Sequence, residues 1–393
     1  MKKTLMICAA ALLFMGCGSH GNMSADDPLG DSGRTQRTEN LLANLKALGD
    51  SSVYLFGHHD DTVYGIGWEA DYENDSTVHQ RSDVKSVCND FPALLSFDLG
   101  RIELGSERNL DGVPFDRLRK EIIAHYDKGG MITLSWHADN PLSGGTSWVA
   151  DSLKELETKT VASILEGGEK HELFLSWLDK VADFLNSLET PYGVKVPVLF
   201  RPWHEHTGSW FWWGQEHCTA DQYKALWKLT CERLKDKGVV NVLYAYSPGT
   251  EPDGDETKYM ERYPGDDIID LLGLDCYCFA PEADTTQIAH YAATLDKNLG
   301  MVCRIAKQHG KAAAATETGY ECLKAQDWWT KTLAPVLERH PLSYVLVWRN
   351  AHNRPNHYFA PYPGQQTVSD FIQFYNQKPT LFLKDVNGLY LKK

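Results

Sequence analysis

Eight short apolar runs, separated by amphipathic stretches, constrain the fold of this 393-residue chain more than any other feature. The runs lie at residues 53–57, 92–99, 131–136, 196–200, 240–246, 268–274, 312–316 and 343–348. The stretches with helical spacing lie at residues 116–126, 172–188, 221–237, 287–309 and 326–339, with two more at 38–48 and 368–375. Near-continuous apolar strands that alternate with helices are typical of a parallel sheet covered on its outside. We therefore expect an α/β fold, the (β/α)8 or TIM barrel.

An open, doubly wound sheet is the structural alternative. Such a sheet usually carries a glycine-rich fingerprint directly after its first strand. Here the first run leads into Gly57-His58-His59-Asp60, which is not that fingerprint. The sequence therefore favours the barrel.

Polar and aromatic residues gather at the C-terminal end of nearly every apolar run. In chain order they are residues 58–61, Asp98, Trp136, His137, His204, Glu205, residues 275–277, Glu317 and residues 348–350. The C-terminal ends of the strands are where a barrel builds its active site.

The segment of residues 201–214 is the most informative part of this set. It places the carboxylate of Glu205 at the end of a strand and four consecutive aromatic residues, 210–213, in the turn that follows. An acid beside exposed indole rings is typical of a site that cleaves sugars. Aromatic residues in such a turn can also belong to the core, and we expect at least one of Trp212 and Trp213 to be buried there.

Glu205 and Glu317 end the fourth and seventh predicted strands. Cleavage of a β-glycosidic bond with retention needs two carboxyl groups about 5–5.5 Å apart, and strand ends of one barrel can supply that separation. Each glutamate alone could instead form a structural ion pair or cap a helix. The pair in this setting favours catalysis.

The motif Arg-Pro-x-His-Glu at residues 201–205, followed by Gly-x-Trp-Phe-Trp-Trp-Gly at residues 208–214, resembles glycoside hydrolase family 26. Shorter matches lie at residues 56–59, 275–277 and 316–319, and the resemblance covers nearly all of the chain after residue 33. Members of that family are mostly β-mannanases, with some β-1,3-xylanases and β-glucanases.

The resemblance implies that Glu205 is the acid/base and Glu317 the nucleophile of a retaining hydrolase. It also implies six substrate-binding or supporting residues: His137, His204, Trp210, Tyr277, Trp348 and Arg349. Among these, Tyr277 would hydrogen-bond the nucleophile, and Trp210 and Trp348 would stack on the sugars beside the scissile bond.

Strand alternation places two expectations on the fourth strand. It would turn His204 away from Glu205, so a bulge is expected at the strand end. It would also put Arg201 and Trp203 on the face of Glu205, where Arg201 would orient the acid or lower its pKa.

Two histidine-rich segments, residues 58–61 and 204–206, raise the possibility of a metal site. No His-Glu-x-x-His motif or cysteine cage accompanies them, and sugar hydrolysis requires none. We expect neither a metal nor a cofactor.

The N-terminus predicts a bacterial lipoprotein. A basic start and the apolar run of residues 5–15 precede Gly16-Cys17, so residues 1–16 are interpreted as a signal peptide and Cys17 as the lipidated residue. Residues 17–33 are then a flexible tether, and residues 34–393 the catalytic domain. An ordinary secretory signal or an uncleaved anchor is the alternative, and Phe14 is an unusual residue for a lipoprotein signal.

We expect an outer-membrane lipoprotein of the bacterial cell envelope, and its periplasmic face is favoured because no acidic run follows Cys17. Acidic residues outnumber basic ones by 53 to 39, which argues against nucleic acid and against an anionic membrane surface as partners. Membrane contact is expected only through the lipid. Seven of the nine cysteines follow the lipidated Cys17, so at least one has no partner within the chain.

The predicted function is therefore retaining hydrolysis of β-1,4-mannosidic bonds in mannan, galactomannan or mannooligosaccharides by a monomer. A β-1,3-xylanase or a β-glucanase is the alternative within the enzyme class. A lipoprotein that only binds glycans is the alternative outside it. Two long loops, residues 101–114 and 142–168, could close one end of the cleft and favour mannobiose as product.

Overall fold

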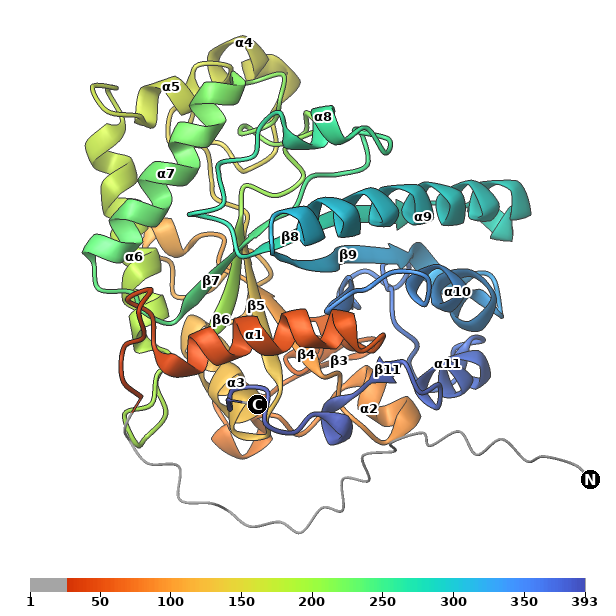
Figure 1. Cartoon of the computed structure of the whole chain (residues 1–393). Coiled ribbons are helices and arrows are strands. Elements are labelled where there is room, and N and C mark those ends of the chain that lie inside the picture. Colours follow the sequence, from red (N-terminus) through yellow and green to blue (C-terminus); the bar gives the residue numbers. More distant parts are fainter. Residues whose placement is uncertain (1–26, 393) are drawn as a thin grey trace, which may run out of the picture.

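Eight parallel strands close into a barrel in the computed structural model, which describes residues 27–392 (Figure 1). In barrel order the strands are β1 (Tyr54–His59), β4 (Leu94–Asp98), β5 (Met131–Trp136), β6 (Val198–Pro202), β7 (Val242–Tyr246), β8 (Leu271–Cys278), β9 (Ala312–Tyr320) and β10 (Tyr344–Val347). Pairing of β10 with β1 closes the barrel. The TIM barrel and all eight predicted strands are confirmed.

The longer helices cover the outside of this barrel (Figure 1). They are α1 (Gln36–Asp50), α3 (Phe115–Asp127), α6 (His171–Ser187), α7 (Ala220–Asp236), α9 (Thr285–Gln308) and α11 (Val368–Tyr375). Side chains at the helix starts fix several of these boundaries. Thr219 and Gln222 form a reciprocal capping box at α7, and Asp284 accepts two backbone N–H groups at the start of α9.

The predicted helix of residues 326–339 is wrong as one continuous element. A π-helical turn, Trp329–Leu333, precedes the short α10 (Ala334–Leu337). Pro335 cannot donate a backbone hydrogen bond, so it is tolerated only in the first turn of α10. The side chain of Asp370 accepts the backbone N–H groups of Trp329 and Thr330 at the irregular turn.

Several short elements have no counterpart in the sequence prediction. They are the hairpin of β2 (Tyr64–Gly65) and β3 (Trp68–Glu69), the strand β11 (Thr380–Leu381) and the helices α2 (Asp83–Cys88), α4 (Lys154–Glu157), α5 (Thr160–Ile164) and α8 (Glu256–Met260). Apart from β11, all of them lie in the segments that follow β1, β5 and β7.

A bulge in β9 reorients the end of that strand. Leu274 of β8 pairs with Ala315, but Asp275 pairs with Glu317, so Thr316 is the extra residue. Thr316 and Glu317 therefore both reach partners inside the barrel, Ser247 and Arg201 respectively. Gly273 leaves room for the bulge, because a Cβ at this position would lie 2.4 Å from the side chain of Thr316.

The chain before β1 is fixed to the far end of the barrel from the strand C-termini. Arg34 makes two hydrogen bonds to Asp270, of 2.7 and 2.8 Å, and Thr35 caps α1. Asp27 accepts the backbone N–H of Arg37. Cys17 and the predicted signal peptide lie outside the described residues, and within residues 27–392 no helix combines the length and apolarity needed to cross a membrane.

Candidate active site

The two predicted catalytic glutamates meet at the C-terminal end of the barrel. One carboxyl oxygen from each of Glu205, Asp275 and Glu317 lies within 4.8 Å of the other two. Glu317 is only 3% exposed, whereas Glu205 is partly open to solvent. A separation this short suits a direct attack by one carboxylate, because an inverting pair needs room for a water between the two groups.

Arg201 holds the buried side of this cluster in place. Its guanidinium donates to Glu317 and to Asp275, the latter at 2.7 Å, and Arg201 itself is 1% exposed. Burial alone would lower the pKa of Arg201, but the two carboxylates raise it above its ordinary value, so it stays charged. The expectation that Arg201 orients Glu205 is wrong in its partner, because the hydrogen bonds go to Glu317 and Asp275. The charge of Arg201 does act to lower the pKa of Glu205, as expected, although burial outweighs it.

Asp275 is the site residue to which sequence reasoning assigned no role. Its carboxylate accepts from Ser247 at 2.7 Å and from Thr316 at 2.8 Å, besides Arg201. Burial raises the pKa of Asp275 to about 7, and the charge of Glu317 adds to this while Arg201 opposes it. Asp275 stands at the end of the sixth predicted strand, close to Tyr277, and this position could have identified it as a site residue.

The surroundings of Glu205 favour its protonated form. Burial raises its pKa well above the ordinary value, and the charges of Asp275 and Glu317 raise it further. Trp210 acts in the opposite direction, because its indole N–H donates to the carboxylate at 2.8 Å. Glu317 has two donors instead, Arg201 and the hydroxyl of Tyr277 at 2.5 Å. Two carboxyl groups in different surroundings are the arrangement that acid and nucleophile roles require.

The turn after β6 positions Glu205 without the expected bulge. The strand ends at Pro202, and both Trp203 and Glu205 adopt left-handed conformations with φ of 57° and 53°. Glu205 donates its backbone N–H to the carbonyl of Ser247 at 2.7 Å, which fixes the turn to the next strand. Trp203 does not share the face of Glu205, since its indole N–H bonds Thr230 on α7.

The aromatic residues of the motif divide between the cleft and the core. Trp210 is partly exposed and lies over Gly208, where a Cβ would come within 2.2 Å of its ring. Trp212 and Trp213 are both fully buried, which confirms the expectation that at least one would be. The indole of Trp213 donates to the carbonyl of His204 at 2.8 Å, so the core tryptophans also support the site.

His137 and His204 lie together on one side of the glutamates. Nδ1 of His137 lies 2.6 Å from Asp98, and its Nε2 lies 3.2 Å from Nε2 of His204. Burial alone would lower the pKa of His137, but Asp98 raises it above its ordinary value. Burial, aided by the charge of Arg201, lowers the pKa of His204 far below its usual range. The pair therefore offers one readily charged and one neutral imidazole.

Trp348 and Arg349 extend this side of the cleft. The ring of Trp348 stacks on His59 with centroids 4.0 Å apart. Arg349 donates to the hydroxyl of Tyr64 at 3.1 Å and to the carboxylate of Asp111. Asp111 comes from the loop of residues 101–114, so this loop does reach the site, although no sequence motif distinguishes Asp111 within it.

The remaining histidines of the two candidate metal segments have partners within the protein. His58 bonds Asp61 at 2.7 Å, and His206 contacts the hydroxyls of Tyr223 and Tyr246. In the cluster of three carboxylates the guanidinium of Arg201 already supplies a positive charge. The seven cysteines of the described chain are free thiols, with Cys276 and Cys278 among the buried ones.

Comparisons with known proteins agree on one family of enzymes. The model of glycosyl hydrolase family 26 matches residues 31–321. A GH26 β-mannanase structure from Bacteroides ovatus is 52% identical, with a TM-score of 0.85, and the match covers 92% of this chain and 98% of that one. Mannan endo-1,4-beta-mannosidases from Bifidobacterium adolescentis and Bacillus subtilis are 30% and 27% identical over 92% and 72% of this chain. The chain spans 36% of the Bifidobacterium relative and 76% of the Bacillus one.

The hydrogen bond from Trp210 predicts a change in pH dependence. A general acid works protonated, so activity falls as the pH rises through the pKa of Glu205. Trp210→Phe removes a donor that stabilises the carboxylate, and the pKa of Glu205 should rise. The alkaline limb of kcat/KM should move up by about one pH unit. A shift of that size corresponds to roughly 1.4 kcal/mol, which is near the lower end of the range for one hydrogen bond to a charged group.

The matched control is Trp148→Phe, because Trp148 is 59% exposed and makes no hydrogen bond to Glu205. Its alkaline limb should stay where the wild-type limb lies. An unchanged or lowered limb in Trp210→Phe would contradict the assignment of Glu205 as the acid.

Proposed function

Since the chain belongs to glycosyl hydrolase family 26, we propose that it is a retaining endo-β-1,4-mannanase acting on mannan, galactomannan or mannooligosaccharides. The observation that carries the proposal is the pair of carboxyl groups within 4.8 Å, one raised in pKa and one held by Arg201 and Tyr277. The names of the relatives support mannan as the substrate class.

In the first step, a carboxylate oxygen of Glu317 attacks the anomeric carbon, and the bond to the leaving oxygen breaks. Glu205 gives its proton to that oxygen, and a covalent glycosyl-enzyme forms. The ester no longer carries the negative charge that raised the pKa of Glu205. Glu205, now ionised, is therefore suited to take a proton from the water that attacks the same carbon and releases Glu317.

Around this reaction, the other residues of the site bind the sugar. Trp210 and Trp348 supply aromatic faces on either side of the glutamates, and stacking on such faces suits the C–H surface of a pyranose. His137, His204 and Arg349 supply hydrogen bonds on the non-reducing side. Asp111, in the loop of residues 101–114, fixes Arg349 there. This contact supports a cleft that is short on the non-reducing side, which favours mannobiose among the products.

A substrate panel tests the proposal. The domain should hydrolyse linear mannan and galactomannan much faster than β-1,3-xylan or β-glucan. Faster cleavage of xylan or glucan would contradict mannan as the substrate. Binding without hydrolysis of any of these polymers would favour a glycan-binding protein.

The two glutamates should respond differently to replacement by alanine. Glu317→Ala cannot form the glycosyl-enzyme, so activity should fall by several orders of magnitude on every substrate. Glu205→Ala should still react with an aryl β-mannobioside, because a good leaving group needs no protonation, and a burst should precede slow turnover. Azide should then rescue Glu205→Ala and give a β-configured product.

The control is Glu216→Ala, since Glu216 is exposed in the loop that follows the motif and pairs only with Lys154. It should keep wild-type rates. Azide rescue of Glu317→Ala with β-configured product, in place of Glu205→Ala, would reverse the two roles.

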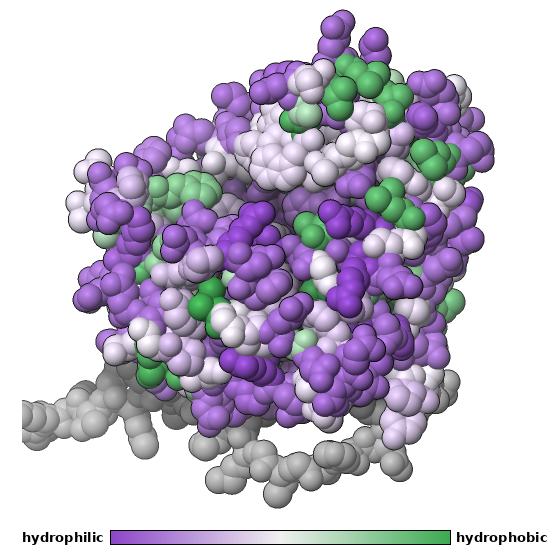
Figure 2. All heavy atoms as spheres, turned by 180° about the vertical axis from the view of Figure 1, so that it is seen from behind, coloured by the Kyte–Doolittle hydropathy of each residue, from purple (hydrophilic) through white to green (hydrophobic). Residues whose placement is uncertain are grey.

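We also propose that the chain is a monomeric envelope lipoprotein anchored through Cys17, which lies outside the described residues. On the face drawn in Figure 2, the described residues are mostly hydrophilic and the apolar ones are scattered, which suits a protein without a broad apolar partner surface. Cys17→Ala should abolish fatty-acid labelling and membrane fractionation. A Cys17→Ala protein that still fractionates with membranes would contradict the lipid anchor.

A further inference from the structure

We propose that a cavity between the loops after β9 and β10 is a second carbohydrate-binding site, which holds another part of the β-mannan chain during hydrolysis. This proposal rests on the proposed function. The cavity has a volume of about 540 Å³, within the usual range of small-molecule sites. It is lined by Cys322, Lys324, Asn356, Tyr358, Tyr362, Gly364, Gln365 and Gln366, and none of these is a residue of the catalytic site.

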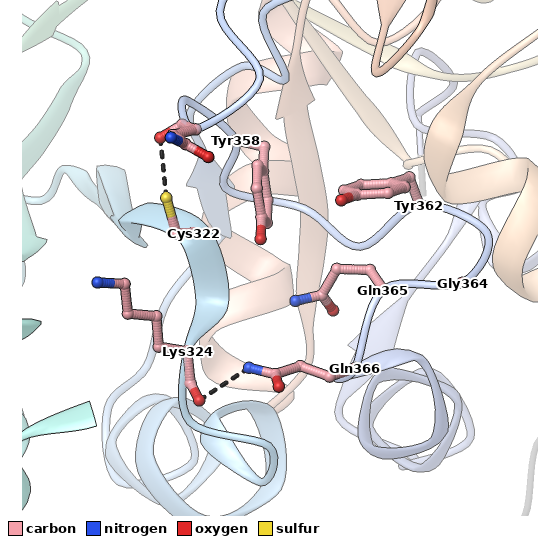
Figure 3. A pocket seen from close by; sticks show the side chains of 8 residues that line it. Cys322, Lys324, Tyr358, Tyr362, Gly364, Gln365 and Gln366 are labelled. Carbon is pink, nitrogen blue, oxygen red and sulfur yellow. Dashed lines mark hydrogen bonds between the residues drawn. The ribbon is translucent and has the colours of Figure 1, made fainter. Parts of the chain in front are cut away.

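Hydrogen bonds between the two loops fix the walls of the cavity. The backbone N–H of Cys322 donates to the carbonyl of Tyr358 at 3.0 Å, and its thiol donates to the carbonyl of Asn356 at 2.8 Å. The side-chain amide of Gln366 donates to the carbonyl of Lys324 at 2.8 Å (Figure 3). A site with fixed walls loses little conformational freedom when a ligand binds.

The lining suits a neutral sugar. The rings of Tyr358 and Tyr362 stand nearly perpendicular, at 86°, with centroids 5.2 Å apart. Their hydroxyls point into the space beside the amide of Gln365 (Figure 3). A pyranose can lay its C–H face on one ring while its hydroxyl groups meet the phenol and amide groups.

The charge of the cavity argues against an anionic ligand. Among the residues that line the cavity, Lys324 alone is cationic. The ammonium group of Lys324 is paired with Glu282 at 2.8 Å. The other polar groups of the lining are amides, hydroxyls and a thiol. A neutral polymer rich in hydroxyl groups fits this chemistry better than a phosphate or a carboxylate.

The cavity lies at the same end of the barrel as the glutamates, because its lining residues follow the C-terminal ends of β9 and β10. Tyr358 faces the cavity, while its neighbour Phe359 packs edge-on against Tyr277 with centroids 5.5 Å apart. Phe359 also fills the space over Gly319, two residues after Glu317. We expect a long polymer to contact both places and a substrate of two sugar rings to occupy the catalytic site alone.

The test compares a polymeric with a short substrate in Tyr362→Ala. The KM for galactomannan should rise about fivefold with kcat unchanged, the size expected for loss of one aromatic contact. Rates on an aryl β-mannobioside should stay at the wild-type level, which also shows that the variant is folded. The matched control is Tyr192→Ala, a 76% exposed tyrosine in the loop before β6, at the opposite end of the barrel. It should change neither rate.

Binding is measured by electrophoresis through galactomannan gels in the Glu317→Ala background, where adding Tyr362→Ala should reduce the retardation. Equal polymer kinetics and equal retardation would overturn the second site. An equal loss on both substrates would also overturn it, because Tyr362 would then act through the catalytic cleft. If the wild-type protein cleaves no mannan, the proposed function fails. Gels of mannan, xylan and glucan then still test the cavity. If Tyr362→Ala changes the retardation in none of these gels, the second site is overturned.

Discussion

The rest of the site depends on one interaction, the pairing of the buried guanidinium of Arg201 with the carboxylates of Asp275 and Glu317. Desolvating three ionisable groups is costly, and a buried ion pair stabilises a protein only when its remaining hydrogen bonds are satisfied. Here Ser247 and Thr316 complete the shell of Asp275, and Tyr277 completes that of Glu317. Removing a single partner from such a cluster typically costs about 3–5 kcal/mol. The hydrogen bond from Arg201 also holds the carboxylate of Glu317, the proposed nucleophile, in place.

The geometry around Arg201 explains why two strands depart from regular structure. The bulge at Thr316 brings Glu317 opposite Asp275, and the left-handed turn at Trp203 and Glu205 moves the acid out of the strand. Left-handed non-glycine residues cost about 1–3 kcal/mol each, and they persist where surrounding contacts determine them. The hydrogen bond from the buried Trp213 to the carbonyl of His204 supplies such a contact. Burial in this part of the chain thus serves the position of Glu205 as well as the core.

The barrel and the proposed catalytic pair could be predicted from the sequence, because both depend on local patterns. Apolar runs define strands, and Glu205 and Glu317 stand at strand ends within distinctive motifs. The partner of Arg201 could not be predicted, since strand alternation says which face a residue shares but not how two strands are staggered. Asp111 lies in a long loop whose path depends on Arg349, more than two hundred residues later. Tyr362 and the cavity depend equally on two loops meeting in space.

The stereochemistry of the first product tests the central claim most directly. Two displacements at the same carbon restore its configuration, whereas attack by water alone inverts it. NMR spectra of a mannooligosaccharide digest, recorded before mutarotation, should show the β-anomer of the new reducing end first. An initial α-anomer would contradict Glu317 as a nucleophile held by Arg201 and Tyr277.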